Sequence, residues 1–205
     1  MMKWKRALPY VAVGLMAGQT MLMLVSWIYS AARPTSGVRS LLSGEGLRWF
    51  FGHFAEMVSS PALAWLLLLS IAFGCLQQCG LLSLKVYSRQ SYRERRAMLI
   101  TLLLLLAYVG VIAMLALVPH SVLLSATGHL WPSPFSASLI PFVAFGIILL
   151  SSVYGIVAGC FDTLGDVYRS MISGIGMGAP VFLFYILVIQ IYYSIRYTLP
   201  QNPYF

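Results

Sequence analysis

The chain has 205 residues, of which 60% are hydrophobic and only 9% are charged, and its formal net charge is +8. Soluble domains carry about 25% charged residues, so this composition excludes an ordinary soluble domain and leaves too little polar chain for a water-facing active site. We therefore predict an all-α polytopic membrane protein that forms a single membrane domain over residues 1–205.

Five apolar runs are long enough to cross the hydrocarbon of a bilayer, which takes about 20 residues of helix. These predicted transmembrane helices cover about residues 10–32, 61–84, 97–118, 138–161 and 175–195. The first run follows the basic segment MMKWKR, as it would in a signal peptide. It has 23 residues, from Tyr10 to Ala32, whereas the apolar region of a signal peptide has about 7–15. An uncleaved first span is therefore expected, with a cleaved signal peptide as the alternative.

An amphipathic helix is predicted at about residues 44–58, between the first two spans. Ser43 and Glu45 suit the start of this helix. Pro61 suits the first turn of the next span, where its missing N–H would have no partner in any case. The apolar residues follow the spacing of one helix face, and they are Leu47, Phe50, Phe51, Phe54, Met57 and Val58. Such a helix beside a span should lie in the plane of the membrane interface.

A second amphipathic helix is predicted at about residues 162–173, in the sequence DTLGDVYRSMI. Asp162 is the expected N-cap, because its side chain can accept a backbone N–H and its charge complements the helix dipole. The segment SGIGMGAP follows, with three glycines before Pro180. It predicts a bend between this helix and the fifth span.

The basic residues are divided unevenly between the two sides of the membrane. Nine of the 13 Lys and Arg residues fall in the N-terminal segment, the loop after the second span and the 162–173 helix. Short loops rich in Lys and Arg stay in the cytoplasm, so the N-terminus is predicted to be cytoplasmic and the C-terminus to lie on the other side. The main topology determinants are Lys85, Arg89, Arg93, Arg95 and Arg96. Their place beside a span indicates contact with membrane lipids and argues against a nucleic-acid partner.

Glutamines are the main polar side chains predicted inside the membrane, because no Asp, Glu, Lys, Arg or His falls within the five apolar cores. Solute transporters usually carry ionisable residues there. The candidates are Gln19 in the first span, Gln77 and Gln78 late in the second, and Gln190 in the fifth. A glutamine in hydrocarbon must find a hydrogen-bond partner. These residues therefore either join helices or line a substrate path, and the sequence leaves both interpretations open.

Small residues recur at a four-residue spacing in two spans. They are Gly14 and Gly18 in the first span, and Ser151, Gly155 and Gly159 in the fourth. This spacing lets two helix backbones approach closely in a membrane. It predicts helix packing, either within the chain or at a dimer seam.

Candidates for catalysis or metal binding are few. Cys75 and Cys79 lie four residues apart on one helix face, but two further ligands are missing, so we interpret them as packing residues. His53, His120 and His129 are isolated from one another. We therefore predict no catalytic residue, no metal site and no cofactor, and a protein that is not an enzyme.

Four stretches of the chain follow the order and spacing of a known family. They are SLLSGEGLRWFFGHFAEMVSSPALAWLLLLSIAFGCLQQCGLLS, ERRAMLITLLLLLAYVGVIAMLALVP, SPFSASLIPFVAFGIILLSSVYGIVAG and DVYRSMISGIGMGAPVFLFYILVIQ. They resemble four segments of the p-aminobenzoyl-glutamate transporter (AbgT) family. The first stretch is similar to the family's first outer segment and second span, and the second to the span that opens its second half. The third is similar to the next span, and the fourth to the interfacial helix and the broken span that follow. The resemblance covers roughly residues 8–196. It implies an inner-membrane protein whose C-terminus is periplasmic.

The resemblance also implies what this sequence is missing. Members of the family carry two re-entrant hairpins whose Asn, Ser, Thr and acidic residues form the substrate and cation site. Neither hairpin has a counterpart here, so no binding residue of the family can be assigned to a position of this chain. Secondary transporters depend on such broken elements. We therefore expect a shortened member that serves as a non-enzymatic scaffold or accessory subunit of a membrane transport complex, bound to another membrane protein or to itself. The alternative is an active transporter or exporter of p-aminobenzoyl-glutamate-like or antifolate compounds that works as an oligomer.

Overall fold

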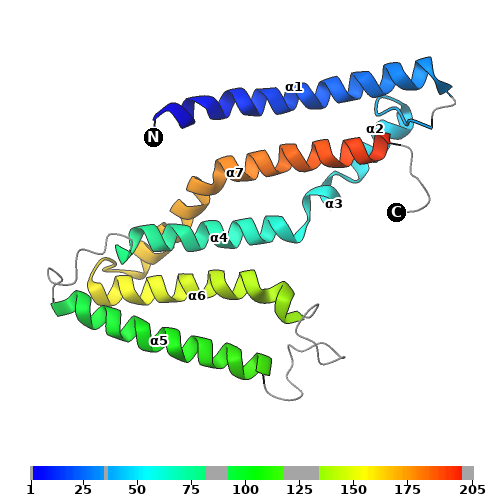
Figure 1. Ribbon diagram of the computed structural model, residues 1–205. Coiled ribbons are helices and arrows are strands. Elements are labelled where there is room, and N and C mark those ends of the chain that lie inside the picture. The colour runs from blue at the N-terminus through cyan, green and yellow to red at the C-terminus, as the bar shows by residue number, and fades with distance from the viewer. Residues whose placement is uncertain (1, 35–36, 82–91, 118–133, 200–205) are drawn as a thin grey trace. The chain divides into compact units, whose positions relative to one another are not determined.

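The computed structural model describes residues 2–34, 37–81, 92–117 and 134–199 (Figure 1). Over these residues the chain forms helices and no strand. Five of the helices are long and apolar enough to cross a membrane, which confirms the prediction of an all-α polytopic membrane protein. The chain divides into two compact units, the first made of residues 1–63 and 179–205 and the second of residues 64–178.

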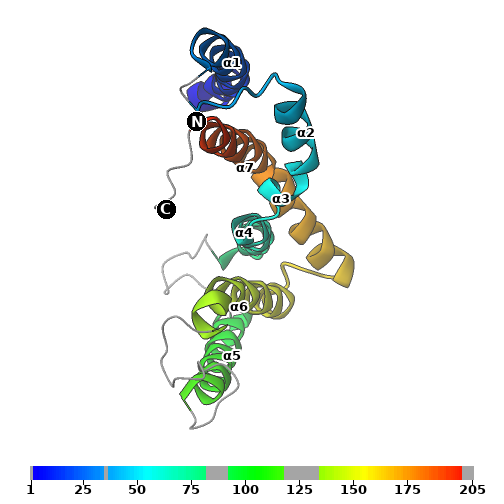
Figure 2. The ribbon, with the colours of Figure 1, turned by 90° about the vertical axis from the view of Figure 1, so that its right-hand side faces the viewer.

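The first unit is built from helix α1 (Met2–Ala32) and the second half of helix α7 (Leu164–Thr198), with the short helices α2 (Gly44–Gly52) and α3 (Phe54–Val58). Helix α1 runs beside this half of α7 in both views (Figures 1 and 2). The buried or half-buried residues of α1 recur every three or four positions, and they include Ala12, Leu15, Gln19, Met23 and Ser26. One stripe of α1 therefore makes its contacts within the unit, and most of its apolar surface stays exposed.

The segment predicted as one helix at about residues 44–58 forms two helices that meet at His53. Ser43 caps α2 as predicted, because its Oγ accepts the N–H of Gly46 at 3.0 Å. His53 has φ −100° and ψ 8°, which departs from helical values. Gly52, the residue before it, has a low helix propensity, and this favours a break at that point.

The apolar stripe predicted on this segment is only partly buried. Phe50 and Met57 are buried, whereas Phe51 is 72% exposed. An exposed aromatic ring on a helix beside the membrane can enter the headgroup region. The exposed part of the stripe is therefore consistent with the expected interfacial position.

Aromatic rings fasten α2 to the end of α7. Trp49 stacks on Tyr197 with the ring centroids 4.2 Å apart. Arg39, on the connection before α2, donates its backbone N–H to the carbonyl of Thr198 at 3.3 Å, and its guanidinium lies 5.8 Å from the centre of the Tyr197 ring. Tryptophan and tyrosine are enriched where spans leave the hydrocarbon. The contact thus ties residues 37–43, α2 and the end of α7 together at one end of the first unit.

The second unit holds most of helix α4 (Pro61–Gln78), helices α5 (Tyr92–Leu117) and α6 (Pro134–Ala158), and the first half of α7. Helix α4 begins at Pro61 as predicted but ends at Gln78 rather than at about residue 84. The chain turns at Gly80, whose φ of 79° lies in the left-handed region that glycine adopts without strain.

Helix α6 ends in a similar way, at Ala158 rather than at about residue 161. Gly159 has a φ of 79°. The carbonyl of Gly155 accepts the N–H groups of Cys160 at 2.8 Å and of Phe161 at 3.0 Å, so the end of the helix is satisfied by its own turn. The turn leads into the buried apolar cluster of the second unit, which comprises Cys79, Ala97, Tyr154 and Phe161.

Helices α5 and α6 lie side by side as an antiparallel pair (Figures 1 and 2). The hydroxyl of Tyr108 on α5 donates to the carbonyl of Phe142 on α6 at 2.8 Å. The ring of Tyr108 lies against Gly146, where an added Cβ would come within 2.8 Å of a ring carbon. The absence of a side chain at Gly146 is therefore what lets the two helices pack around this ring.

The structure corrects the prediction for the last two elements. The helix expected at about residues 162–173 and the span expected at about residues 175–195 belong to one helix, α7, with Pro180 inside it. In hydrocarbon no water is present to bond free backbone groups, so membrane helices continue through glycine and proline residues that would end a soluble helix. The glycines of SGIGMGAP are therefore helical residues.

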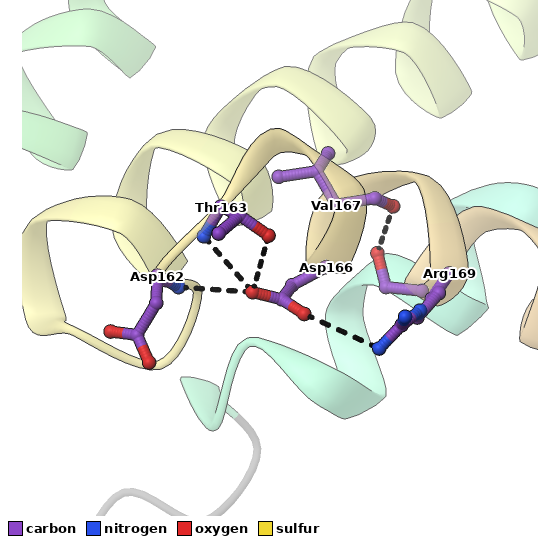
Figure 3. A network of polar contacts seen from close by, with 6 residues as sticks. Asp162, Thr163, Asp166, Val167 and Arg169 are labelled. Carbon is purple, nitrogen blue, oxygen red and sulfur yellow. Dashed lines mark hydrogen bonds and ion pairs between the residues drawn. The ribbon is translucent and has the colours of Figure 1, made fainter.

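The start of α7 also differs from the prediction, because Asp166 rather than Asp162 supplies the capping carboxylate (Figure 3). Asp166 Oδ2 accepts the backbone N–H groups of Asp162 at 3.2 Å and of Thr163 at 2.9 Å, and the hydroxyl of Thr163 at 2.9 Å. Arg169 Nη1 lies 4.0 Å from the other carboxylate oxygen. A carboxylate in the first turn satisfies the free N–H groups and complements the helix dipole.

Candidate functional site

A polar contact joins two spans inside the first unit. Gln19 of α1 donates from Nε2 to the Oγ of Ser194 of α7 at 2.8 Å. Gln19 is 9% exposed and Ser194 is fully buried. A hydrogen bond between helices in hydrocarbon contributes about 0.6–2 kcal/mol. The structure therefore places Gln19 at a helix–helix contact.

The same glutamine has a second buried atom that lacks a partner. Gln19 Oε1 is shielded from solvent and makes no hydrogen bond within the described residues. A buried acceptor left without a donor costs about 1–3 kcal/mol. The oxygen is thus an unpaired acceptor inside the α1–α7 contact, and a further donor reaches it only when that contact opens.

Helices α4 and α7 cross in the second unit at a pair of glycines. A Cβ added to Gly74 would come within 2.5 Å of backbone atoms of Gly174 and of the carbonyl of Ser170. A side chain at either glycine would therefore push the two helices apart. Small residues permit this close backbone approach, which supplies the packing that drives helix association in membranes.

Polar side chains reinforce this crossing. Gln78 Nε2 donates to Ser173 Oγ at 2.7 Å. The hydroxyl of Ser170, which is fully buried, lies 3.5 Å from Cys75 Sγ. Among the predicted polar candidates, Gln78 thus joins helices as Gln19 does, but in the other unit.

The four predicted glutamines are divided between the two units. Gln77 is exposed and Gln190 is half-buried. Gln19 and Gln190 belong to the first unit, whereas Gln77 and Gln78 belong to the second. Within the described residues, therefore, neither unit collects all four around a common path.

The packing candidates of the fourth span make the contacts described here within α6 and the turn that follows it. Ser151 is buried and its hydroxyl donates to the carbonyl of Ile147 in its own helix. Gly155 lies directly against the ring of Phe161, and Gly159 forms the turn that ends α6. These residues shape one end of the second unit.

The packing candidates of the first span face open space. Gly14 and Gly18 are exposed, and no atom of the described residues lies within 4 Å of the place where a Cβ would stand on either. The stripe is thus not used for packing within the part of the chain that the structure describes.

The predicted topology determinants are partly described. Lys85 and Arg89 lie outside the described residues. The other three lie at the start of α5, and they are Arg93, Arg95 and Arg96. The guanidinium of Arg96 lies 5.2 Å from the centre of the Tyr92 ring. Cations and an aromatic ring therefore gather where α5 begins, as is typical of the end of a span.

The cysteines differ in exposure. Cys79 is fully buried, and this burial raises the pKa of its thiol above the ordinary value. Cys160 is exposed. His120 and His129 lie outside the described residues. Among the residues that the structure does describe, no three His, Cys, Asp or Glu side chains gather in a way that could hold a metal ion.

The glycine crossing is the contact that sequence reasoning missed, although its signal was present. Ser70 and Gly74 on α4, and Ser170 and Gly174 on α7, have the same four-residue spacing of small residues as the candidates named above. The predicted bend at residues 174–180 assigned Gly174 to a break and so concealed its packing role.

Comparison of the chain with protein-family models, with curated proteins and with solved structures gave no match. The resemblance to the AbgT family therefore stays a prediction that depends on the four sequence stretches. What the structure defines is an all-α, multi-pass membrane protein.

Proposed function

We propose that this protein is a non-enzymatic scaffold or accessory subunit of a membrane transport complex. It would lie in a bacterial inner membrane with a cytoplasmic N-terminus and a periplasmic C-terminus. The observation that carries the proposal is the open stripe of Gly14 and Gly18 on α1. Small residues at this spacing favour close approach of a second helix, and we assign that helix to another membrane protein.

The glycine stripe locates the contact better than the apolar surface does. Val13 is 65% exposed and Met21 is 67% exposed on the same helix. Exposed apolar side chains do not by themselves favour helix association in a membrane, because lipid tails are as apolar as leucine. Close packing against small residues does favour association, since it brings two helix backbones into van der Waals contact.

The sequence resemblance supports the class of complex. The stretches that resemble the AbgT family correspond to its spans and interfacial segments, and the two hairpins that form the substrate and cation site have no counterpart in this sequence. A subunit of this origin keeps the surfaces with which such spans pack, and its partner holds the transport site.

The test is purification of the tagged full chain from native membranes in mild detergent, with mass spectrometry of what remains bound. We compare the wild type with Gly14→Leu plus Gly18→Leu, and with the matched control Val13→Leu plus Thr20→Leu on another exposed face of α1. The partner should be present in a fixed ratio in the wild type and the control. Loss of about 1.4 kcal/mol of packing lowers its affinity for the glycine variant about tenfold. Equal retention by both variants, or a chain that purifies alone, contradicts the proposal.

A second candidate function is active transport by an oligomer, and the unpaired Oε1 of Gln19 favours it. When the contact between α1 and α7 opens in a transport cycle, an amide N–H of a p-aminobenzoyl-glutamate-like or antifolate compound could supply the missing donor. Gln19→Ala should then abolish flux without reducing the amount of protein in the membrane, whereas Gln77→Ala, at an exposed position, should not. A homo-oligomer with no other partner and a Gln19-dependent flux would select this function over the scaffold.

A further inference from the structure

Two of the three cysteines lie at the ends of helices in the second unit. Cys79 follows Gln78, the last residue of α4, and Cys160 follows Gly159, which comes directly after α6. Each cysteine is next to a glycine that turns the chain with a φ of 79°. Cys79 is fully buried, whereas Cys160 is exposed. The two thiols thus occupy matching places at two helix ends, one inside the buried apolar cluster and one outside it.

The buried apolar cluster joins these two helix ends. Cys79 belongs to it together with Phe161, and Ala158 packs against it. Ala158 and Phe161 come shortly before and directly after Cys160 in the chain. Because consecutive Cα atoms are only about 3.8 Å apart, the backbone of Cys160 lies at the edge of the cluster that contains Cys79.

The electrostatic effect of one thiol on the other indicates how near they are. Burial raises the pKa of the Cys79 thiol, and negative charge at Cys160 raises it further, at least as much as negative charge at Cys75 does. Cys75 is four residues earlier on the same helix face, where Cβ atoms lie about 5–6 Å apart. Since the Coulomb interaction weakens with distance and with exposure to water, Cys160 lies about as near to Cys79 as Cys75 does.

The remaining gap is small enough for a side-chain movement to close. A disulfide brings its Cβ atoms to about 3.5–4.5 Å, so the approach required is about 1–2 Å. Residues 159–163 belong to neither α6 nor α7, and the exposed side chain of Cys160 can turn about χ1 without leaving a packed position. Cys79 is held in place, because its Sγ donates to the carbonyl of Leu76 at 3.2 Å. The exposed thiol is therefore the one that moves.

We propose that Cys160 and Cys79 form a reversible disulfide with each other when the protein meets a low-molecular-weight disulfide. The Cys160 thiolate attacks one sulfur of that disulfide, forms a mixed disulfide and releases a first small thiol. The Cys79 thiolate then attacks Cys160 Sγ, which closes the protein disulfide and releases a second small thiol. The two cysteines lose two electrons and two protons, and the small disulfide takes up both as it becomes two thiols.

The bond ties the end of α4 to the link between α6 and α7. The topology predicted from the sequence assigns this link to the cytoplasmic side, where thiols are kept reduced. The pair is therefore reduced at rest and closes when disulfide oxidants accumulate. An exposed cysteine beside a second cysteine that completes the disulfide is the usual arrangement of a reversible redox sensor.

The test treats the full chain, in mild detergent that leaves both sides accessible, with oxidised glutathione. Remaining thiols are blocked with a maleimide, and unreduced peptides are mapped by mass spectrometry. The wild type should give a Cys79–Cys160 peptide pair that dithiothreitol removes. Cys75 is the internal control, since it is also fully buried. In the folded protein Cys79 should be preferred over Cys75 as the partner of Cys160 by at least about tenfold, and in guanidinium the two should pair about equally.

Variants identify the two sulfur atoms that react. Cys75→Ala should retain the bond, whereas Cys79→Ala and Cys160→Ser should each lose it. Circular dichroism first checks the helical content of each variant, and the ratio of the two pairings in the wild type depends on no substitution.

Four outcomes overturn the proposal. They are a folded chain that does not react, a mixed disulfide that persists on Cys160 while Cys79 stays free, a Cys75–Cys160 bond that forms as readily as the Cys79–Cys160 bond, and a bond between the Cys160 residues of two chains.

Discussion

Helix α7 makes two different kinds of contact along its length. In the second unit its backbone touches that of α4 at Gly174 and Gly74. In the first unit it meets α1 through the side chains of Ser194 and Gln19, whose polar atoms lie 2.8 Å apart. The comparison teaches that a glycine stripe and a polar side chain are alternative means of joining spans. It also shows that the glycines of α1 are not the ones used for its packing against α7.

The largest expected effect comes from the glycine crossing. Gly74→Leu places a side chain where the backbone of Gly174 already lies, and should destabilise the protein by about 3 kcal/mol or prevent its folding. Gly176→Leu, two residues further along α7, meets no atom within 4 Å and is the matched control. Thermal unfolding in detergent measures both. Equal melting temperatures would show that the crossing does not hold the second unit together.

Cysteine labelling compares a buried and an exposed position of the second unit without changing the glycine crossing. Cys160 is exposed, whereas Cys79 is fully buried at the end of α4, and burial raises the pKa of its thiol. A raised pKa lowers the thiolate fraction at neutral pH, so Cys79 should react with maleimide at least about tenfold more slowly than Cys160. Single-cysteine variants followed by mass spectrometry measure the two rates. An impermeant maleimide also tests topology, because Cys160 should be labelled only from the cytoplasmic side.

The contact in the first unit should have a smaller effect on stability, and its size depends on whether one or both polar partners are removed. Ser194→Ala leaves the buried amide of Gln19 with no partner among the described residues and should cost about 1 kcal/mol. Combining Ser194→Ala with Gln19→Leu removes both polar groups and should restore most of the stability. If the double variant is no more stable than Ser194→Ala, the hydrogen bond is not the source of the effect.

The smallest effect is expected at the start of α7. Asp166→Asn weakens the acceptor that receives three hydrogen bonds from Asp162 and Thr163, so it should lower the melting temperature slightly. Asp162→Asn is the control, since Asp162 contributes its backbone N–H to this network. A larger decrease in melting temperature for Asp162→Asn than for Asp166→Asn would show that Asp162 is the capping residue.

The composition and apolar runs were sufficient to predict the class of fold and the five spans, because crossing hydrocarbon sets a length that few other constraints disturb. Helix ends were harder. Gly80 and Gly159 end α4 and α6 earlier than predicted because each takes a positive φ, whereas the glycines before Pro180 stay helical. A glycine can end a helix or continue it, and the surroundings of the glycine decide which of the two occurs.

The polar contacts between helices could be anticipated from the sequence on one side only. Gln19 and Gln78 were named as polar residues of the spans, and each bonds a serine of another helix, but the sequence could not say that Ser194 and Ser173 would be those partners. Partners far apart in the chain are fixed by how helices cross, and periodicity within one helix does not contain that information.

The central claim is that α1 presents its glycine stripe to another membrane protein, and photo-crosslinking in native membranes tests it most directly. Met21 follows Gly14 by seven residues and so continues the stripe, whereas Met16 lies on another face, and the two are 67% and 57% exposed. A photo-reactive residue at Met21 should give one adduct of defined mass with a different membrane protein, and the same residue at Met16 should give none. Equal adducts from both positions, no adduct from Met21, or an adduct that contains only two copies of this chain would contradict the claim.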